Sequence, residues 1–223
     1  MQYPKLSALY SIDDQYLIGS DLLVKPVTSA GATASEIQFP LSDCWYDVDT
    51  MEAVSPSGAA HGVNLVAVTC DIDKIPVYQR GGSVIPRKLR LRRSAYLMKT
   101  DPYPIYVALD QSKKASGGLY MDDEETFGHN KRNEFAEAFF QADFNSVATI
   151  KNLVITGAGW EAISDKMEMD RMIERIVIMG VENAPEAVTN GVSSIEFEYV
   201  EHARVLVIRK PLVSALREWE ITI

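Results

Sequence analysis

Alternation of apolar and polar residues, repeated along most of the chain, is the feature that most restricts its fold. Between Ile195 and Tyr199 every second residue is apolar and the residues between are glutamates, and the same pattern ends the sequence at Trp219–Ile223. Successive side chains of a β-strand point to opposite faces, so each segment would bury one face. Further runs rich in β-branched and aromatic residues predict strands that end at Val27, Phe39, Cys70, Leu109, Met179 and Ile208. The pattern predicts an all-β fold and shows no βαβ alternation.

Turn-forming residues separate these runs. We expect turns at Ser55–Gly58, Ser116–Gly118, Gly157–Gly159 and Thr189–Gly191. The segment Ile12–Tyr16, preceded by Ser11 in a capping position, predicts one short helical turn. Asn133–Phe144 contains good helix formers, but its phenylalanine spacing fits either structure, and we favour a strand.

Length and charge exclude several classes of protein. A chain of 223 residues favours two modest domains. Its net charge of −9 disfavours nucleic acid as the ligand, because phosphates are bound by Lys and Arg. No apolar run approaches the roughly 20 residues of a membrane-spanning helix. The first twenty residues lack the features of a secretory signal, so we expect a soluble protein whose compartment its own sequence does not assign.

The residues that commonly bind metals or act as nucleophiles are few. Cys44 and Cys70 are either two unrelated thiols, which we favour, or one disulfide. His61, His129 and His202 are expected to be exposed or packed rather than catalytic, although a nucleophilic site assembled in space stays open. The pair Gly81-Gly82 lacks the spacing of a phosphate-binding loop and predicts a tight turn between two strands.

Four consecutive carboxylates, Asp122 to Glu125, follow a predicted strand. A solvated acidic turn is the favoured interpretation, and a weak site for a hard cation such as calcium is the alternative. Paired carboxylates also hydrolyse glycosidic bonds, but that chemistry depends on a separation across a cleft that adjacency in sequence does not give.

Two further groups of residues are candidates for binding surfaces. Trp45, Tyr46 and Trp160 are expected in the core, with stacking platforms for sugar rings as the alternative. The segment Arg87–Arg93 has five basic residues in seven and predicts an exposed strand or an interface with an acidic partner surface.

Several longer motifs resemble glycoside hydrolase family 31. Residues 12–27 resemble the segment in which the catalytic (β/α)8 barrel of that family ends and its C-terminal sandwiches begin. Trp45-Tyr46-Asp47 matches a WYD motif, and Pro76–Pro86 matches the segment that closes the proximal sandwich. The later order of GGLYMDDEETF, RNEFAEAFF, IERIVIMGV and VLVIRKP is most similar to the glucosidase II branch of the family.

The resemblance implies an all-β chain of two consecutive β-sandwich domains after a short remnant of the barrel. Residues 1–20 would be the remnant of the last barrel βα unit, 21–92 the proximal β-sandwich and 93–223 the distal β-sandwich. The catalytic aspartates of the family lie in the barrel, and no position here matches either motif. We therefore expect no catalytic, cofactor-binding or metal-binding residue in this chain and no cofactor. At Glu124 the family usually has glycine, and a positive φ would strain a glutamate.

By resemblance, the chain is the non-catalytic C-terminal region of an α-glucosidase that removes α-linked glucose from N-glycans in the endoplasmic reticulum lumen. Its partners would be the barrel of its own parent chain and a noncatalytic β subunit, with carbohydrate bound through the parent. Without the barrel, Tyr3, Leu9, Tyr16 and Leu17 would be exposed. Two rival hypotheses are a free-standing carbohydrate-binding module that uses Trp45, Tyr46 or Trp160, and an enzyme that uses Asp122, Asp123 or Glu125.

Overall fold

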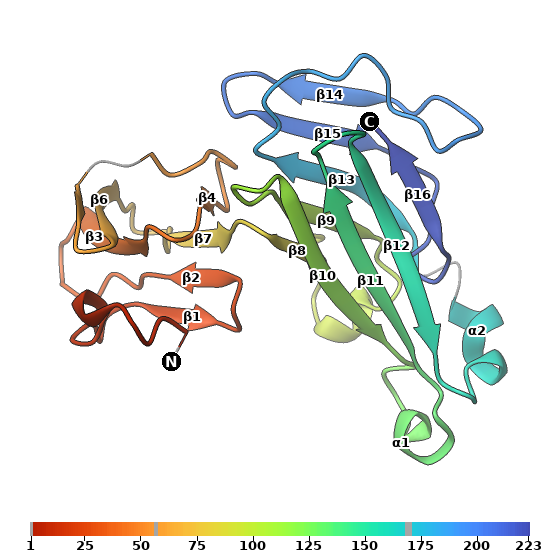
Figure 1. Cartoon of the computed structure of the whole chain (residues 1–223). Coiled ribbons are helices and arrows are strands. Elements are labelled where there is room, and N and C mark those ends of the chain that lie inside the picture. Colours follow the sequence, from red (N-terminus) through yellow and green to blue (C-terminus); the bar gives the residue numbers. More distant parts are fainter. Residues whose placement is uncertain (1, 56–57, 168–170) are drawn as a thin grey trace.

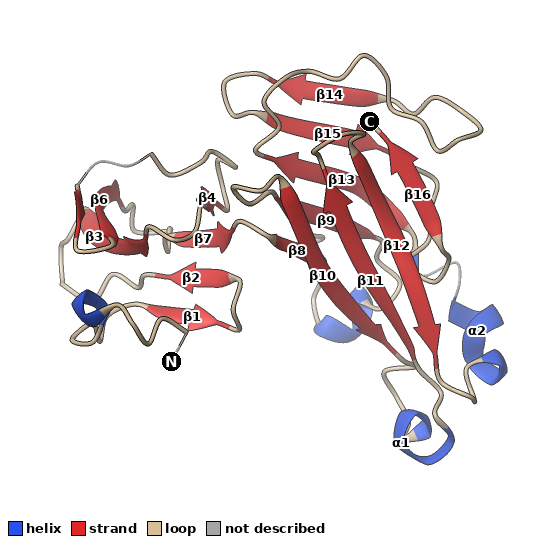
Figure 2. Ribbon diagram, viewed as in Figure 1, coloured by secondary structure: helices blue, strands red, loops and turns tan. Residues whose placement is uncertain are grey.

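The computed structural model describes residues 2–55, 58–167 and 171–223. The chain forms a smaller unit up to the end of β7 and a larger unit from β8 onward, which lie side by side (Figure 1). Strands dominate both units, and the helices are short (Figure 2). Within the described ranges, no helix has the length and apolar character needed to cross a membrane.

The smaller unit packs two antiparallel sheets against each other. The four-stranded sheet has the order β1 (Tyr16–Ile18), β2 (Leu22–Val24), β7 (Val77–Arg80) and β4 (Trp45–Asp47). The three-stranded sheet has the order β3 (Ala34–Pro40), β6 (Val63–Thr69) and β5 (Ala59–Ala60). Side chains from both sheets form one buried core, made of Leu23, Ile37, Phe39, Trp45 and Tyr78. This unit is therefore a small β-sandwich.

The larger unit is built on one nine-stranded sheet. Its order is β14 (Phe197–Val200), β15 (Val205–Arg209), β13 (Ile173–Met179), β9 (Tyr103–Ala108), β8 (Ser83–Pro86), β10 (Lys114–Met121), β11 (Ala136–Asp143), β12 (Thr149–Thr156) and β16 (Trp219–Thr222). Most pairs are antiparallel, but β13 runs parallel to β9 and β10 parallel to β8. The short helices α1 (Gly128–Arg132) and α2 (Glu161–Met167) lie beyond the ends of these strands (Figure 1). Two 3-10 turns cover Ser7–Leu9 and Ala95–Met98.

The nine-stranded sheet curves into a half-barrel around its core. Thr189, in the segment before β14, exchanges two backbone hydrogen bonds of 2.8 Å with Thr222 of β16, so the two ends of the sheet approach each other. Ile105, Phe140, Ile150 and Ile178 are among the fully buried residues inside the curve. The all-β prediction is thus confirmed. In the larger unit, one continuous curved sheet forms both layers of the predicted β-sandwich.

Several predicted elements are confirmed. Strands form in all eight of the runs chosen by alternation or by β-branched composition, and Asn133–Phe144 contains β11 rather than a helix. Along β11 the residues Ala136, Ala138, Phe140 and Ala142 are buried, while the residues between them face outward. The turns at Gly157–Gly159 and Thr189–Gly191 lie outside the strands as expected. The predicted turn at Ser55–Gly58 includes residues 56 and 57, which lie outside the described residues.

Two local predictions are wrong. Ile12–Tyr16 is not helical, because the Gln15 side chain both accepts from the backbone N–H of Gln38 (3.0 Å) and donates to its carbonyl (2.9 Å), which holds the segment extended. Ser116–Gly118 is not a turn but the middle of β10. A Cβ atom on Gly117 would lie 2.0 Å from the carbonyl oxygen of Val84, so glycine is needed there for close approach of β8.

The two units join at Gly81-Gly82, the tight turn predicted between two strands. Gly82 has a φ of 91°, and a Cβ atom on Gly81 would lie 2.1 Å from Sγ of Cys44. Across the joint the hydroxyl of Tyr46 donates to the carbonyl of Leu109 at 2.8 Å. The Tyr46 ring is buried, and this hydrogen bond ties the smaller unit to the end of β9. The domain boundaries at residues 20 and 92 stay predictions. Because β8 pairs with strands of the larger sheet, the structure favours a second boundary before β8 rather than at residue 92.

Candidate functional site

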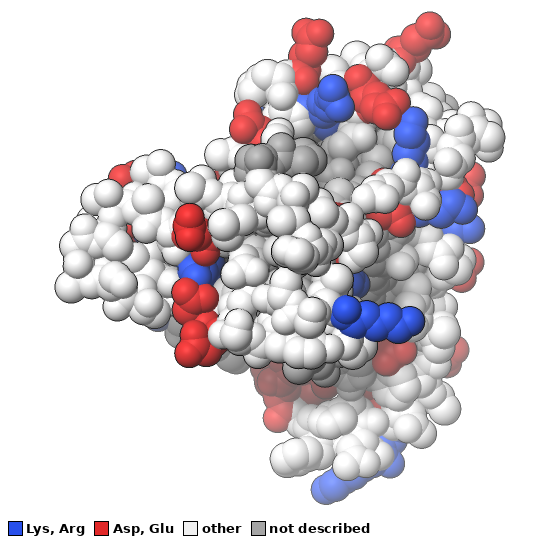
Figure 3. Space-filling view, turned by 60° about the vertical axis from the view of Figure 1, so that its left-hand side comes forward, with Lys and Arg blue, Asp and Glu red and all other residues white. Residues whose placement is uncertain are grey.

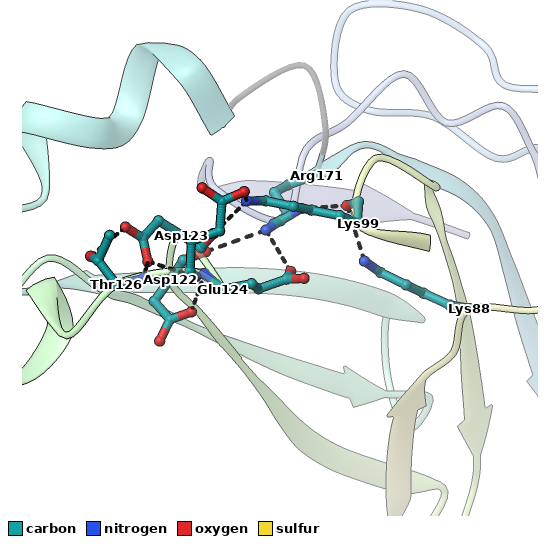
Figure 4. A network of polar contacts seen from close by, with 8 residues as sticks. Lys88, Lys99, Asp122, Asp123, Glu124, Thr126 and Arg171 are labelled. Atoms are coloured by element: carbon teal, nitrogen blue, oxygen red, sulfur yellow. Dashed lines mark hydrogen bonds and ion pairs between the residues drawn. The ribbon is translucent and has the colours of Figure 1, made fainter. Parts of the chain in front are cut away.

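The acidic turn Asp122–Thr126 follows β10 and is held by its own side chains (Figure 4). Oδ1 of Asp122 accepts the backbone N–H of Glu124 at 2.8 Å. Oδ1 of Asp123 accepts the N–H groups of Glu125 and Thr126, and Oδ2 accepts the Thr126 hydroxyl at 2.6 Å. The hydrogen bond from the Thr126 hydroxyl is the main cause that lowers the pKa of Asp123 to about 2. Asp123 is therefore ionised and fully engaged near neutral pH.

Arg171, in the segment before β13, anchors the acidic turn. Its side chain is 1% exposed, and its guanidinium donates to the carbonyl of Lys99 at 2.7 Å and to the carboxylate of Glu124 at 2.8 Å. Lys99 in turn reaches the carboxylate of Glu125 at 2.9 Å. Figure 4 shows these groups pointing toward one another from the turn, from the loop before β9 and from the segment before β13. The network joins three segments that are distant in sequence.

The acidic turn is therefore a structural joint. Each of its four carboxylates already accepts a hydrogen bond or an ion pair from the protein. Among residues 2–55, 58–167 and 171–223, no three His, Cys, Asp or Glu side chains are grouped so that they could hold a metal ion. This arrangement can hold the loop in place, but it does not leave a pair of free carboxylates that could hydrolyse a glycosidic bond.

The basic segment Arg87–Arg93 is a loop, so the predicted strand is wrong. Its cations bind different elements: Arg87 lies 4.0 Å above the ring of Tyr106, Arg90 pairs with Glu174 and Arg92 pairs with Asp101 at 2.6 Å. These separate contacts prevent a regular ladder. Leu89 and Leu91, at alternate positions, remain exposed, and Leu91 is 98% exposed. The segment therefore presents Leu89 and Leu91 outward between arginines that are themselves partly exposed, Arg90 at 48% and Arg92 at 40%.

The aromatic residues considered as sugar platforms lie in the core. Trp45, Tyr46 and Trp160 are 2%, 5% and 8% exposed, which confirms the core interpretation and contradicts a carbohydrate module that uses these three residues. The exposed aromatic rings include Tyr120, Phe127 and Phe139 instead. A single sequence does not distinguish the two sets, because the burial of an aromatic ring depends on residues that are distant in sequence.

Of the cysteines and histidines, Cys44 and His202 line one surface cavity of about 570 Å³, and Cys70, His61 and His129 lie elsewhere. Both thiols are free; that of Cys44 donates to the carbonyl of Leu109 at 3.3 Å, and burial raises its pKa. His61 lies in the turn between β5 and β6, His129 in α1 and His202 in the turn between β14 and β15. The nearest acidic partner of His129 is Asp122, at 3.5 Å. Within the described part of the chain, both thiols donate to backbone carbonyls, and neither is hydrogen-bonded to an imidazole.

One hollow on the surface was not anticipated from the sequence. A groove of about 520 Å³ runs over β10, β11 and β12 and is lined by polar side chains that include Ser116, Gln141, Asp143, Thr149 and Lys151. These residues are far apart in sequence, and only the register of the three strands aligns them. On the face seen in Figure 3, acidic and basic side chains are dispersed among uncharged ones and form no continuous basic strip.

The chain matches known proteins along its length. Residues 1–85 match the family model described as the glycosyl hydrolase family 31 C-terminal domain. The chain is 38% identical over 217 residues to neutral alpha-glucosidase AB of Dictyostelium discoideum, an alignment that covers 95% of this chain and 21% of the relative. It is also similar to the human protein of the same name, at 36% identity over 99% of this chain and 22% of the relative. The chain thus spans about a fifth of these curated relatives.

The fold agrees with a solved structure. A crystal structure of the glucosidase II alpha subunit bound to Glc1Man2 superimposes with a TM-score of 0.76 and 30% identity, over 95% of this chain and 24% of that chain. The superposition includes both β-units, since it covers nearly the whole chain. The chain belongs to glycosyl hydrolase family 31, as part of the C-terminal β-rich region of that family.

Proposed function

We propose that this chain is the non-catalytic C-terminal region of a retaining α-glucosidase and that it supports the catalytic barrel of its parent. The observation that carries the proposal is the alignment of 95% of the chain with 21% of a neutral alpha-glucosidase. The internal use of all four carboxylates of the acidic turn supports a structural role. The parent would hydrolyse α-linked glucose with residues outside this chain.

Exposed apolar side chains near the N-terminus support docking on a further part of the parent. Tyr10, Tyr16 and Ile18 are each more than half exposed, on the edge strand β1 and the loop before it. Tyr3 and Leu17 instead pack against the core of the smaller unit, and Leu9 is partly buried, so of the four side chains expected to be exposed only Tyr16 is. Large apolar side chains gathered at one edge commonly mark an interface.

The loop at Leu89–Leu97 supports a second contact surface. Leu89, Leu91, Tyr96 and Leu97 are exposed, while Arg90 and Arg92 next to them are tied back by Glu174 and Asp101. Basic residues around apolar ones suit a partner surface that is apolar and acidic. We propose that the barrel of the parent covers one or both of these surfaces.

We further propose an endoplasmic reticulum location and a regulatory subunit as partner of the parent. A crystal structure described as the ER glucosidase II heterodimeric complex, of a catalytic subunit with the binding domain of its regulatory subunit, superimposes on this chain with a TM-score of 0.75 and 30% identity. The proposal rests on that similarity.

The experiment is an assay of the purified chain with an aryl α-glucoside, together with a triple variant Tyr10→Ser, Tyr16→Ser and Ile18→Ser. We expect no turnover by either protein, and less binding of a hydrophobic dye by the variant at an unchanged melting temperature. Turnover by the chain that Asp123→Asn abolishes would contradict the non-catalytic role. Unchanged dye binding would contradict the docking edge.

A further inference from the structure

The outer face of β10, β11 and β12 carries four rows of side chains set by strand register. Lys114, Asp143 and Thr149 form the first row, and Ser116, Gln141 and Lys151 form the second. Gly118, Phe139 and Leu153 form the third, and Tyr120, Glu137 and Ile155 form the fourth. Successive rows lie about 7 Å apart, because a strand rises about 3.4 Å per residue and every second residue faces outward.

The first two rows line the groove of about 520 Å³ and leave hydrogen-bonding groups unused. In the described part of the chain, the side chains of Ser116, Gln141 and Lys151 make no hydrogen bond or ion pair with the protein. They supply a hydroxyl, an amide and an ammonium group in one line across three strands. The volume falls within the range of small-ligand sites, about 300–1,000 Å³.

The charge of the groove is balanced. Lys114 pairs with Asp143 at 2.9 Å, and the remaining Lys151 is offset by Asp110 on the groove wall. A phosphate or another anion would meet two carboxylates there, and a cation would meet two ammonium groups. The lining therefore suits an uncharged ligand rich in hydroxyl groups.

An open aromatic ring adjoins the polar rows. Phe139 is 37% exposed and stands directly beside Gln141 on the outward face of β11. Its neighbour across the strand pair is Gly118, which has no side chain to cover the ring and where an added Cβ atom would meet nothing closer than 3.5 Å. The face of an aromatic ring is negative and attracts the slightly positive C–H groups on the apolar face of a sugar.

We propose that this face binds a neutral oligosaccharide, with one sugar ring stacked on Phe139 and the next hydrogen-bonded to Ser116, Gln141 and Lys151. The side chains of Tyr120 and Phe135, whose rings stack at 5.8 Å, extend the apolar end of the same face. The site would hold carbohydrate close to the parent enzyme without taking part in hydrolysis. It requires neither the catalytic barrel nor any glucosidase activity, so its failure and the failure of the proposed function are separate results.

The test is calorimetric titration of the full chain with two neutral probes, maltotetraose and an α-linked mannotetraose, and with inorganic phosphate. We expect one or both oligosaccharides to bind and phosphate not to bind. Phe139→Ala and Gln141→Ala should each weaken the affinity about tenfold, which corresponds to about 1.4 kcal/mol. Gly118→Leu should abolish binding by covering the ring, at a position where the backbone leaves room for a side chain.

The matched control is Phe127→Ala, which removes an exposed phenylalanine next to the acidic turn, outside the groove. It should leave the affinity unchanged, and thermal unfolding should show all four variants folded. Absence of binding by both oligosaccharides, binding of phosphate alone, or oligosaccharide binding that survives Gly118→Leu would each overturn the proposal.

Discussion

The buried guanidinium of Arg171 donates a 2.8 Å hydrogen bond to the carboxylate of Glu124, a residue held at a φ of 58°. This is the position at which the family resemblance implies glycine. The turn keeps the left-handed backbone that glycine favours, and the glutamate at this position supplies a partner for a buried cation. The strain costs roughly 1 kcal/mol, and a hydrogen bond to a charged group contributes a similar or larger amount.

Glu124 should therefore respond differently to its two simplest replacements. Glu124→Ala and Glu124→Gly both remove the partner of Arg171, but only glycine relieves the positive φ. We expect the glycine variant to be about 1 kcal/mol more stable than the alanine variant. Urea unfolding of both proteins measures this difference, and equal stabilities would show that the backbone conformation at Glu124 carries no strain.

Arg171 should be needed for the stability of the larger unit. Arg171→Met keeps much of the side-chain volume but removes one of the two donors to the carbonyl of Lys99, leaving only Lys88, and leaves Glu124 without its cation. We expect a loss of about 2 kcal/mol in the free energy of unfolding. Arg171→Lys, as a control, retains the charge but not the forked geometry and should lie between the two. Wild-type stability in the methionine variant would contradict the role of this joint.

The acidic turn should weaken in strong acid. The pKa of Asp123 falls from 3.8 in the unfolded chain to about 2 in the folded protein, so folding favours the ionised form. The resulting stabilisation is complete above about pH 4 and is lost as the pH falls through about 2. Asp123→Asn should lower stability at neutral pH and flatten the dependence between these two values. Unfolding midpoints measured from pH 5 to about pH 2 test this, and parallel curves for both proteins would count against it.

Alanine substitutions at two neighbouring glycines of β10 should differ sharply in their effect on stability. Gly117→Ala places a methyl group 2.0 Å from the carbonyl oxygen of Val84 and should destabilise the protein by about 2–3 kcal/mol, because β8 and β10 would have to separate. Gly118→Ala is the matched control: its methyl group meets nothing closer than 3.5 Å, so stability should change little or rise. Thermal unfolding of the pair decides the matter, and similar melting temperatures would mean that the close approach is not maintained in solution.

The elements predicted correctly are those in which local pattern and burial agree. Alternation at Ile195–Tyr199 and Trp219–Ile223 predicts the strands because one side of each faces the core. The errors arise where distant residues decide: Gln38 holds Gln15 extended, and Val84 requires a glycine at 117 inside a strand. Glu174 and Asp101 draw the arginines of the predicted basic strand in different directions.

The candidate site likewise has one part that the sequence predicts and another part that it does not. The acidic turn is visible in the sequence because its hydrogen bonds join residues two or three positions apart. Its anchor, Arg171, is 47 residues away from Glu124 and carries no local signal. The groove was missed for the same reason, since Ser116, Gln141 and Lys151 meet only through strand register.

The central claim is that this chain supports a catalytic domain that it does not contain. The most direct test replaces the homologous fifth of Dictyostelium neutral alpha-glucosidase AB with this chain and measures hydrolysis of an aryl α-glucoside. We predict that the relative without its C-terminal region is inactive or unfolded, that the chimera regains turnover, and that the chain alone has none. Turnover by the chain alone, or full activity of the relative after this region is removed, would contradict the account.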